Sequence, residues 1–350
     1  MGEITIKDIA RLCNVGVSTV SRAINNHPDI TAETKQRIMD TIQEYGYVPN
    51  NSARNLKRTD AKCIAILVKG MTNPFFADMI QVMEECIQKK KYAMVMRHVE
   101  FDEDEVDIAL ELIKEKRLRG IVFLGGYFHS NEKLEKIQVP FILSTVGCPP
   151  ENMSRNLYSS ISVDDCKESY RMTEYLICQG KRRIAILTAT EEDGSIGSMR
   201  LQGYRNALAA YGIEERPALI RYMHSGRAEY SMENGYSLTQ ELINLNEEFD
   251  AIFAISDVMA IGACRALHDS GIRVPEDISV AGFDGLTMGD YFIPAITTMR
   301  QPAVEMAHAT MEQLFAVIGG KKEHQHIVFE AQLLEKESVK KALERIAEME

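Results

Sequence analysis

The segment TIKDIARLCNVGVSTVSRAIN, residues 5–25, contains two short helical patterns separated by a break. A T-x-x-D capping signal that begins at Thr5 predicts a helix from Ile6 to Cys13. Asn14-Val15-Gly16 interrupts the pattern, and a second, amphipathic helix is expected from Val17 to Asn25. Two short helices joined by a tight turn that contains glycine form a helix-turn-helix.

The second helix has two chemically different faces when its residues are placed at 100° intervals. Its apolar face comprises Val20, Ala23 and Ile24, and its polar face comprises Val17, Ser18, Ser21, Arg22 and Asn25. Beyond Pro28, Thr31 is expected to cap a third helix that stops at Gly46. Ile38, Met39 and Ile42 of the third helix are expected to point toward the other two helices. The sequence therefore predicts an all-α helix-turn-helix headpiece.

From residue 63 onward, short apolar runs alternate with amphipathic helical patterns. The expected strands are CIAILVK (63–69), YAMVMRH (92–98), GIVFLGG (120–126), PFILS (140–144), RIAILTA (183–189), ALIRYM (218–223), AIFAIS (251–256) and ISVAGF (278–283). Apolar strands separated by helices are typical of buried parallel sheets with helices on both faces. Because this region is too long for one such sheet, we expect an α/β core of two doubly wound lobes with a crevice at the strand ends.

These patterns predict four segments. They are the headpiece at residues 1–48, a linker at 49–61, the core at 62–340 and a C-terminal tail at 341–350. We expect one lobe to comprise 62–161 with 291–320, and the other to comprise 162–290 with 321–340. Helices as short as the linker are marginal in water, so it should be helical only when something supports it. The tail has too short an apolar stripe for a coiled coil that would form a tetramer.

The charge of the chain is unevenly distributed. Its formal net charge is -11, which as an average argues against a protein that coats nucleic acid. Residues 1–62, however, carry nine Lys and Arg against seven Asp and Glu, a net charge of +2, and the remainder carries -13. In the linker and at the first residue after it, Arg54, Lys57, Arg58 and Lys62 accompany one anion, Asp60. The basic segment therefore coincides with the helix-turn-helix and is suited to phosphates.

Several classes of protein are excluded by what the sequence lacks. A hydrophobic content of 45% with 26% charged residues excludes a disordered chain. The start has no apolar signal-peptide core, and no run reaches the ~20 apolar residues of a membrane span, so we expect a cytoplasmic protein without a membrane partner. Seven widely spaced cysteines without a C-x-x-C pair indicate reduced thiols rather than disulfides or zinc.

Enzymatic and metal-binding motifs are also absent from the sequence. No G-x-x-x-x-G-K-[ST], G-x-G-x-x-G, G-x-S-x-G or H-E-x-x-H pattern occurs, so we expect neither an enzyme nor a cofactor. His324 and His326 would share one face of a possible strand, but without a third ligand nearby we expect a solvated edge and no metal. A solute-binding transport component would share the two-lobed core, but would need a signal peptide in place of residues 1–60.

Seven motifs occur along the chain in a characteristic order. They are TIKDIARLCNVGVSTVSRAIN (5–25), YGYVPNNSARNLKR (45–58), NPFFADM (73–79), RLQGYRNAL (200–208), SDVMAIGACRAL (256–267), VPEDISVAGFDG (274–285) and TTMRQP (297–302). In this order they resemble the LacI/GalR family of bacterial transcriptional regulators over essentially the whole chain. The resemblance implies a homodimer whose paired headpieces bind a palindromic operator in double-stranded DNA. It also implies a core like that of periplasmic sugar-binding proteins, which takes a small effector that alters DNA affinity.

The second headpiece helix would place its N-terminal part in the major groove. Val17, Ser18 and Arg22 would then meet base edges, and Arg22 can donate two hydrogen bonds to guanine O6 and N7. The resemblance implies that positions 17 and 18 set operator preference. Phosphate contacts are expected from Thr5, Thr19, Ser21 and Asn25. The family commonly has Ser where this chain has Gly16, which predicts weaker helix capping without loss of function.

In the linker, the apolar side chain of Leu56 stands among Asn and Arg residues and has no core to join. The resemblance implies that Leu56 is inserted into the central minor groove of the operator, which bends the DNA. Ala53 would permit close approach to the DNA, and Arg54 with Lys57 would bind the flanking phosphates. The alternative is that Leu56 packs on the core as an ordinary linker residue.

Effector-binding residues are expected at the carboxyl ends of the core strands. Positions just past the strands give Asn73, Phe75, Tyr127, Ser144, Thr145, Ser256, Asp257 and Asp284, and the resemblance adds Arg200 and Gln301. Carboxylates, amides, an Arg and aromatic faces suit a sugar or another polyhydroxyl ligand. Asn73 and Asp257 have an alternative role, because either could serve only to cap the helix that begins beside it.

The crevice departs from the family at three of these positions. Sugar-binding members often have Asp-Arg where this chain has Ser144-Thr145, and usually have Asn where it has Ser256. The loss of an acidic and a basic group leaves a modified sugar, a glycoside or a nonsugar effector open. We expect a DNA-binding regulator that represses genes for carbohydrate use. Whether the effector releases DNA or strengthens binding stays open, as does the role of a protein coregulator.

Overall fold

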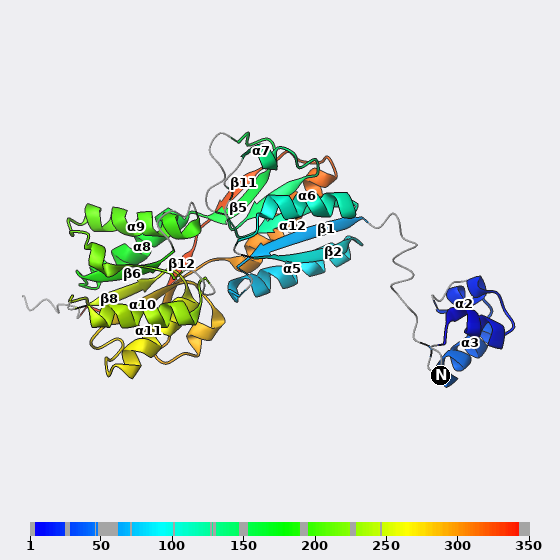
Figure 1. Ribbon diagram of the computed structural model, residues 1–350, viewed down its shortest axis with the longest axis horizontal. Coiled ribbons are helices and arrows are strands. Elements are labelled where there is room, and N and C mark those ends of the chain that lie inside the picture. Colours follow the sequence, from blue (N-terminus) through cyan, green and yellow to red (C-terminus); the bar gives the residue numbers. More distant parts are fainter. Residues whose placement is uncertain are drawn as a thin grey trace, which may run out of the picture. The chain divides into compact units, whose positions relative to one another are not determined.

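The computed structural model describes residues 4–24, 29–45, 47, 62–70, 72–100, 102–126, 128, 131–146, 153–189, 195–224, 229–245 and 247–342. The chain divides into two units, Met1–Ala61 and Lys62–Glu350. Figure 1 shows the first unit as a group of short helices and the second as two lobes that each contain a sheet. Among the described helices, none is both long and apolar enough to cross a membrane.

The headpiece consists of the helices α1 (Ile6–Leu12), α2 (Val17–Ile24) and α3 (Ala32–Glu44). The predicted helix-turn-helix is thus confirmed. The two predicted capping residues, Thr5 and Thr31, are the N-cap residues of α1 and α3. The backbone N–H of Thr5 donates to the Asp8 carboxylate at 3.0 Å, and the hydroxyl of Thr31 accepts from the backbone N–H of Thr34 at 3.4 Å. Asn25 and Gly46 lie outside the described residues.

The headpiece core is small, and this corrects one prediction. Ile9, Val20 and Ile38 from the three helices are fully buried together. Met39, which was also expected to point inward, is 39% exposed, and Ile42 is half-buried. Met39 is rotated by about 100° from Ile38 on the helix. A core this small is filled by Ile38, so the adjacent side chain remains at the surface.

The first lobe contains a six-stranded sheet in which every pair of neighbours is parallel. Its order is β11 (His326–Phe329), β5 (Ser159–Val163), β4 (Phe141–Ser144), β3 (Leu118–Leu124), β1 (Cys63–Lys69) and β2 (Ala93–Val99). The lobe's helices are α5 (Phe75–Lys89), α6 (Glu105–Glu115), α7 (Asn131–Leu134) and α12 (Ala303–Ile318). Helix α6 packs on one face, and α5 with α12 on the other, so the central strands are buried on both faces.

The second lobe contains another six-stranded sheet. Its order is β12 (Gln332–Leu334), β10 (Thr297–Arg300), β9 (Ser279–Asp284), β8 (Ala251–Ala254), β6 (Ile184–Thr188) and β7 (Ile220–Tyr222). Only β12, at one edge, is antiparallel to its neighbour. The helices are α8 (Asp165–Cys178), α9 (Ile196–Ala210), α10 (Met232–Asn244) and α11 (Asp257–Asp269), with 3-10 turns η1 (Pro217–Leu219) and η2 (Thr287–Asp290). Figure 1 shows α8 and α9 over one face and α10 and α11 over the other.

All eight predicted strands are present, with ends that differ by a few residues, and the two-lobed α/β core is confirmed. Strands β5, β10 and β12 were missed, and β11 was expected only as a possible strand. The missed strands are short and contain polar residues, whereas the predicted ones are apolar runs. In β10, for example, Thr297 and Thr298 are fully buried, and the backbone N–H of Thr297 donates to the Ser338 hydroxyl at 2.8 Å.

The predicted allocation of the C-terminal segments to the lobes was wrong at two strands. Strand β10 was placed in the first lobe within 291–320, but it pairs with β9 in the second. Strand β11 was placed in the second lobe within 321–340, but it pairs with β5 in the first. The chain thus passes between the lobes after β5, after β10 and after β11. Each sheet receives an edge strand from the C-terminal segment, a pairing that the hydrophobic pattern does not specify.

His326, the first residue of β11, and His324, two residues before it, differ from the predicted solvated edge. Strand β11 does lie at the edge of the first sheet, but both imidazoles are half-buried. Nδ1 of His324 lies 3.0 Å from the Ser159 hydroxyl, and Nδ1 of His326 lies 2.8 Å from that of Ser160. Burial lowers the pKa of His324. Within the described ranges, no three His, Cys, Asp or Glu side chains are grouped as a metal ion would require.

Candidate ligand pocket and nucleic-acid interface

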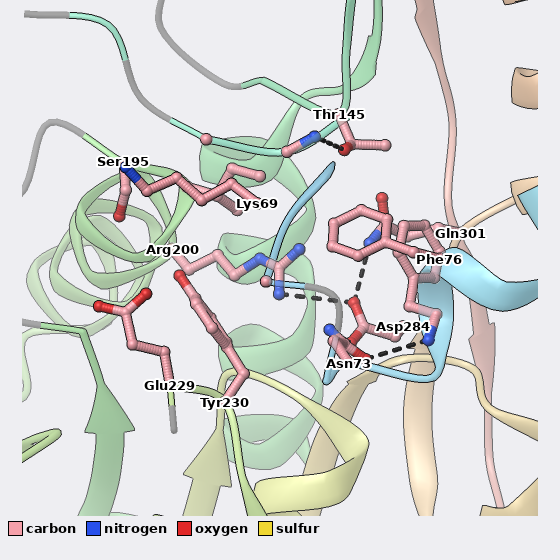
Figure 2. Close-up of a pocket in the computed structure, with 15 residues that line it drawn as sticks. Lys69, Asn73, Phe76, Thr145, Ser195, Arg200, Glu229, Tyr230, Asp284 and Gln301 are labelled. Atoms are coloured by element: carbon pink, nitrogen blue, oxygen red, sulfur yellow. Dashed lines mark hydrogen bonds and ion pairs between the residues drawn. The ribbon is translucent and has the colours of Figure 1, made fainter. Parts of the chain in front are cut away.

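A pocket lies between the two core lobes, where several strands of both sheets end. It is lined by Lys69, Gly70, Asn73, Phe75, Phe76, Gly125, Gly126, Thr145, Ser195, Ile196, Arg200, Glu229, Tyr230, Asp284 and Gln301. Lys69 and Asp284 are the last residues of β1 and β9, and Gly125 and Thr145 directly follow β3 and β4. Figure 2 shows that side chains from both lobes converge on this space. The pocket is thus where ligands bind in open α/β sheets, outside the carboxyl ends of the strands.

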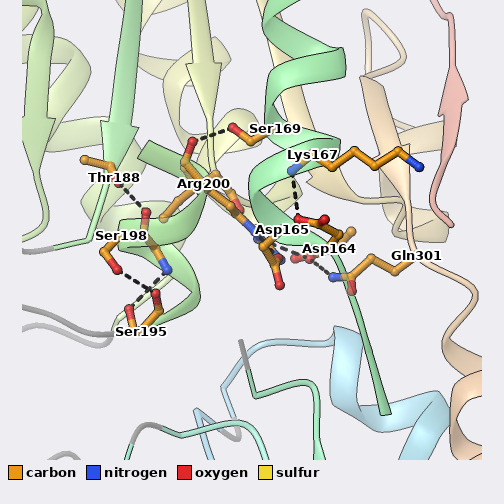
Figure 3. Close-up of polar contacts among 12 residues, drawn as sticks. Asp164, Asp165, Lys167, Ser169, Thr188, Ser195, Ser198, Arg200 and Gln301 are labelled. Atoms are coloured by element: carbon orange, nitrogen blue, oxygen red, sulfur yellow. Dashed lines mark hydrogen bonds and ion pairs between the residues drawn. The ribbon is translucent and has the colours of Figure 1, made fainter. Parts of the chain in front are cut away.

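Arg200 is the most constrained side chain of the pocket, and it is only 4% exposed. Its Nε donates to Oδ1 of Asp165 at 2.8 Å (Figure 3), and its NH1 donates to the Ile255 carbonyl at 2.5 Å. NH1 also lies 3.6 Å from Oδ1 of Asp284. The guanidinium carbon is 3.7 Å from the ring centroid of Phe283. These contacts fix the guanidinium by charge, hydrogen bonding and stacking together.

The sequence around Arg200 explains how it reaches Asp165. Helix α9, which carries Arg200, packs directly on α8, which carries Asp165. Gly203 lies at the contact, where a Cβ atom would come within 2.2 Å of the Cys166 carbonyl oxygen. Glycine at this position of R-L-Q-G-Y therefore permits the close helix approach that joins the two charges.

Asp284 connects the two lobes across the pocket. Its carboxylate accepts from Nε2 of Gln301 at 2.9 Å and from Nδ2 of Asn73 at 3.4 Å (Figure 2). Burial raises the pKa of Asp284 to about 6, against the opposing effects of Arg200, Gln301 and Asn73. Its backbone φ is +109°, a left-handed value that is rare outside glycine, and that of Thr145 is +58°. Backbone strain of this kind is concentrated at functional sites, where it orients side chains.

Lys69 enters the pocket from the first lobe and is buried. Its Nζ lies 3.3 Å from Oε2 of Glu105 and donates to the Glu103 carbonyl at 3.0 Å. Gly126 packs against Glu105, because a Cβ atom there would lie 2.3 Å from Oε1. Lys69, Phe76, Ser195, Glu229 and Tyr230 were not predicted from the sequence. Lys69 could have been found, because it is a polar residue that ends an otherwise apolar strand.

The structure brings together six of the ten predicted effector residues, namely Asn73, Phe75, Thr145, Arg200, Asp284 and Gln301. Tyr127 lies outside the described residues. Ser144 is not in the pocket, because side chains alternate along β4 and its hydroxyl points inward to Thr310 Oγ1 at 3.0 Å. Ser256 instead caps α11, where its hydroxyl accepts from the Met259 N–H at 3.4 Å.

Asp257 also lies outside the pocket, as the alternative of a helix-capping role anticipated. Its carboxylate does not cap α11, however, but accepts a hydrogen bond from another loop. Asp257 is the first residue of α11 and is fully buried. Its Oδ2 accepts from the backbone N–H of Leu286 at 2.6 Å, which ties α11 to the loop after β9. Burial and the neighbouring Asp284 raise the pKa of Asp257 to about 8. Asp257 therefore supports the loop that follows Asp284.

The candidate nucleic-acid interface is the polar face of α2. Val17, Ser18 and Arg22 are exposed there, whereas Val20 and Ala23 are buried on the opposite face. The structure thus has the two faces that the sequence predicted. Thr19 and Ser21 are half-buried, and the hydroxyl of Thr5 donates to Asp8 at 2.5 Å. The other predicted contact residues, Asn25, Ala53, Arg54, Leu56 and Lys57, lie outside the described residues.

Comparisons with known proteins agree with this division of the chain. The family model for bacterial regulatory proteins of the lacI family matches residues 5–50, and a periplasmic binding protein-like domain matches residues 173–339. The HTH-type transcriptional regulator MalR of Clostridium butyricum is 39% identical over 95% of this chain and 98% of its own length. The ribose operon repressor of Haemophilus influenzae is 30% identical over 96% of this chain and 98% of its own length. A solved complex of the transcriptional regulator CelR with cellobiose has a TM-score of 0.69 at 28% identity, covering 96% of this chain and 99% of that one.

Proposed function

This chain belongs to the lacI family of bacterial regulatory proteins, and from that premise we propose that it represses genes for carbohydrate use. A sugar-like effector bound between the core lobes alters its affinity for operator DNA. The relatives support this proposal, since one is named a ribose operon repressor and another is solved with cellobiose. The proposed role is binding and not catalysis, and its place of action is the cytoplasm, where operator DNA lies.

The polar face of α2 is the observation that carries the proposal. Helix-turn-helix proteins place this helix in the major groove, where exposed side chains meet base edges. Arg22 can donate two hydrogen bonds to guanine, Ser18 can bond a base, and Val17 can contact a thymine methyl group. The opposite face cannot serve, because Val20 and Ala23 are buried in the headpiece core.

Selection of bound duplexes from a random DNA pool tests the proposed function. The full chain should enrich a palindromic sequence with two half-sites, because two headpieces would bind together. Enrichment of a single half-site would contradict the proposed homodimer. The absence of any enriched sequence would contradict the proposed regulator itself.

The proposed homodimer would use an apolar surface of the second lobe. Tyr291 and Ile293, after η2, are 84% and 89% exposed, which is unusual for apolar side chains of this size. A groove between α10 and α11 is lined by Met232, Tyr236, Ile261 and Phe292 among others, and Phe292 lies between Tyr291 and Ile293 in the chain. Exposed apolar patches of this kind mark association surfaces.

Ile293→Asp should convert the dimer to a monomer in sedimentation experiments, and the circular dichroism spectrum should remain that of the folded chain, because the side chain is exposed in the single chain. Operator affinity should fall more than tenfold, since half-sites would be bound one at a time. Val328→Asp is the matched control, because Val328 is 62% exposed but lies on β11 in the other lobe. A dimer that persists in Ile293→Asp would refute this interface.

Leu56→Ala should weaken binding to the selected operator more than tenfold and binding to unrelated DNA less than twofold. The physical reason is that a minor-groove wedge contributes only where the operator is bent around it. Competition assays with labelled operator and unlabelled random DNA measure both affinities. Equal losses for the two DNAs would show that Leu56 is an ordinary linker residue.

Acidification should weaken effector binding, because the Asp284 carboxylate must be ionised to accept hydrogen bonds from hydroxyl groups. With its pKa at about 6, Asp284 is mostly ionised at pH 7 and mostly protonated at pH 5. Asp257, with a pKa of about 8, stays mostly protonated over this range. Calorimetric titrations should therefore show affinity falling about tenfold from pH 7 to pH 5.

The variant Asp284→Asn is the control for this pH dependence. It should bind the effector weakly at both pH values, because the amide has lost one acceptor and does not titrate. A wild-type affinity that stays constant between pH 7 and pH 5 would show that Asp284 does not accept hydrogen bonds from the effector.

A further inference from the structure

Four features of the pocket would ordinarily attract an anion. Two are the cations Lys69 and Arg200, and two are the N-termini of helices α5 and α9, which begin among the lining residues. Cationic side chains and helix N-termini are the usual binding groups for phosphate and carboxylate. In this chain, each of the four features is already engaged by a group of the protein itself.

The positive charge of Lys69 is neutralised by a buried carboxylate of the same lobe, that of Glu105. Its Nζ lies 3.3 Å from the Glu105 carboxylate, and both side chains are more than nine-tenths buried. The Glu103 carbonyl accepts a further hydrogen bond from the same Nζ at 3.0 Å. Gly126 packs against Glu105, because a Cβ atom at Gly126 would lie 2.3 Å from Oε1 of Glu105. Glu105 is therefore held beside Lys69, and an incoming anion would have to compete with a buried carboxylate.

The single positive charge of Arg200 lies close to two carboxylates. Asp165 accepts from Nε at 2.8 Å (Figure 3), and Asp284 lies 3.6 Å from NH1 (Figure 2). NH1 also donates to the Ile255 carbonyl, and one face of the guanidinium is covered by the Phe283 ring. Nε and NH1 of Arg200 therefore already have acceptors within the protein, and a phosphate would have to compete with them.

The two helix N-termini are capped by side chains of their own loops. Oδ1 of Asn73 accepts from the Phe75 N–H at 3.1 Å at the start of α5. At the start of α9, the hydroxyl of Ser195 accepts from the Gly197 N–H at 3.1 Å. One backbone donor at each helix start is thus engaged by a side chain of the protein and is withdrawn from an incoming anion.

Among the described residues, the remaining charged groups of the pocket are negative. Glu229 and Asp284 line it, and Glu105 and Asp165 lie directly behind Lys69 and Arg200. Within this described set the four carboxylates outnumber the two cations, so an anionic ligand would be repelled at short range. Carboxylates and amides instead accept and donate to hydroxyl groups, and Phe75, Phe76 and Tyr230 offer ring surfaces for C–H groups.

We propose that the effector is an uncharged polyhydroxyl compound, such as a neutral sugar or glycoside, and that phosphorylated and acidic sugars are excluded. This inference rests on the proposed function, because it concerns the chemistry of the same effector. The proposal distinguishes neutral effectors from effectors that carry one charged group. The groups that exclude anions are the carboxylates of Glu105 and Asp165 and the capping side chains of Asn73 and Ser195.

Matched ligand pairs test the proposal on the full chain. Glucose, ribose, maltose and cellobiose are compared with their monophosphates and corresponding sugar acids by calorimetry and thermal shift. For any pair that binds, the charged member should bind at least 100-fold more weakly than the neutral one. A phosphorylated or acidic sugar that binds more tightly than its neutral partner would overturn the proposal.

Inorganic phosphate provides a test that does not require the effector to be known. The wild-type chain should not bind phosphate in the pocket, whereas Glu105→Gln should gain at least tenfold in phosphate affinity because Lys69 is then unneutralised. Glu103→Gln is the matched control, because it removes the same charge two residues away but leaves the Lys69–Glu105 pair intact. Wild-type phosphate binding that is lost in Lys69→Met would overturn the proposal, even if Glu105→Gln failed to fold.

The two proposals fail in different ways. If a phosphorylated sugar alters operator affinity, the inference about charge is wrong, but effector-controlled DNA binding stands. If no small molecule alters operator affinity, the effector part of the proposed function is wrong, and the phosphate experiment still measures whether the pocket rejects anions.

Discussion

Arg22→Ala is expected to weaken binding to the selected operator by about 1–3 kcal/mol, and to remove the preference for guanine at one position of each half-site. Arg22 is exposed on the polar face of α2 and does not contribute to the buried headpiece core. The loss should therefore appear in DNA affinity and not in the melting temperature. Binding to operators with each base at each position measures both effects.

Arg37→Ala is the control for Arg22→Ala. Arg37 is exposed on α3, so its removal takes the same charge from the headpiece without changing α2. It should lower affinity for all sequences by a similar, smaller factor, because a charge acts on DNA without reading its sequence. If Arg22→Ala also lowered all affinities equally, α2 would not be the helix that reads the bases.

Arg200→Ala is expected to destabilise the core by about 3–5 kcal/mol, the usual cost of removing one partner of a buried ion pair. The variant leaves Asp165 and Asp284 buried without their cation, and it exposes the face of Phe283 that the guanidinium covers. Chemical denaturation of the full chain, followed by a signal from the core, measures this loss. The variant should also lose the response to effector, because Arg200 lines the pocket.

Arg265→Ala is the matched control for Arg200→Ala. Arg265 also forms an ion pair on a helix of the second lobe, with Asp269 at 2.9 Å, but its side chain is 67% exposed. Exposed pairs contribute about 0–1 kcal/mol, so this variant should be nearly as stable as the wild type. Similar losses in the two variants would contradict the buried network around Arg200.

The parts of the fold that could be predicted are those with one strong local signal. The run CIAILVK becomes β1 because both faces of that strand are buried, and Thr5 begins α1 because its capping partner Asp8 is nearby in sequence. Strands β10 and β11 exchange lobes relative to the prediction because their pairing with β9 and β5 depends on long-range register. No local pattern encodes that choice.

The candidate site was predictable in location but not in every residue. Strand ends indicated Asn73, Thr145 and Asp284, and the structure places these three residues in the lining of the pocket. The rule failed at Ser144, because a shift of one residue along a strand moves a side chain to the opposite face. Tyr230 was missed because it follows no predicted strand and reaches the pocket from a segment before α10.

The central claim is that a ligand in the interlobe pocket controls affinity for DNA. The most direct test is the dissociation constant of the full chain for its selected operator, measured with and without a saturating neutral sugar that binds the core. A change of about 5- to 150-fold in either direction is expected in the wild type, the range usual for coupled sites. Asp284→Ala should show no change. An operator affinity that is the same with the pocket filled and empty would contradict the claim.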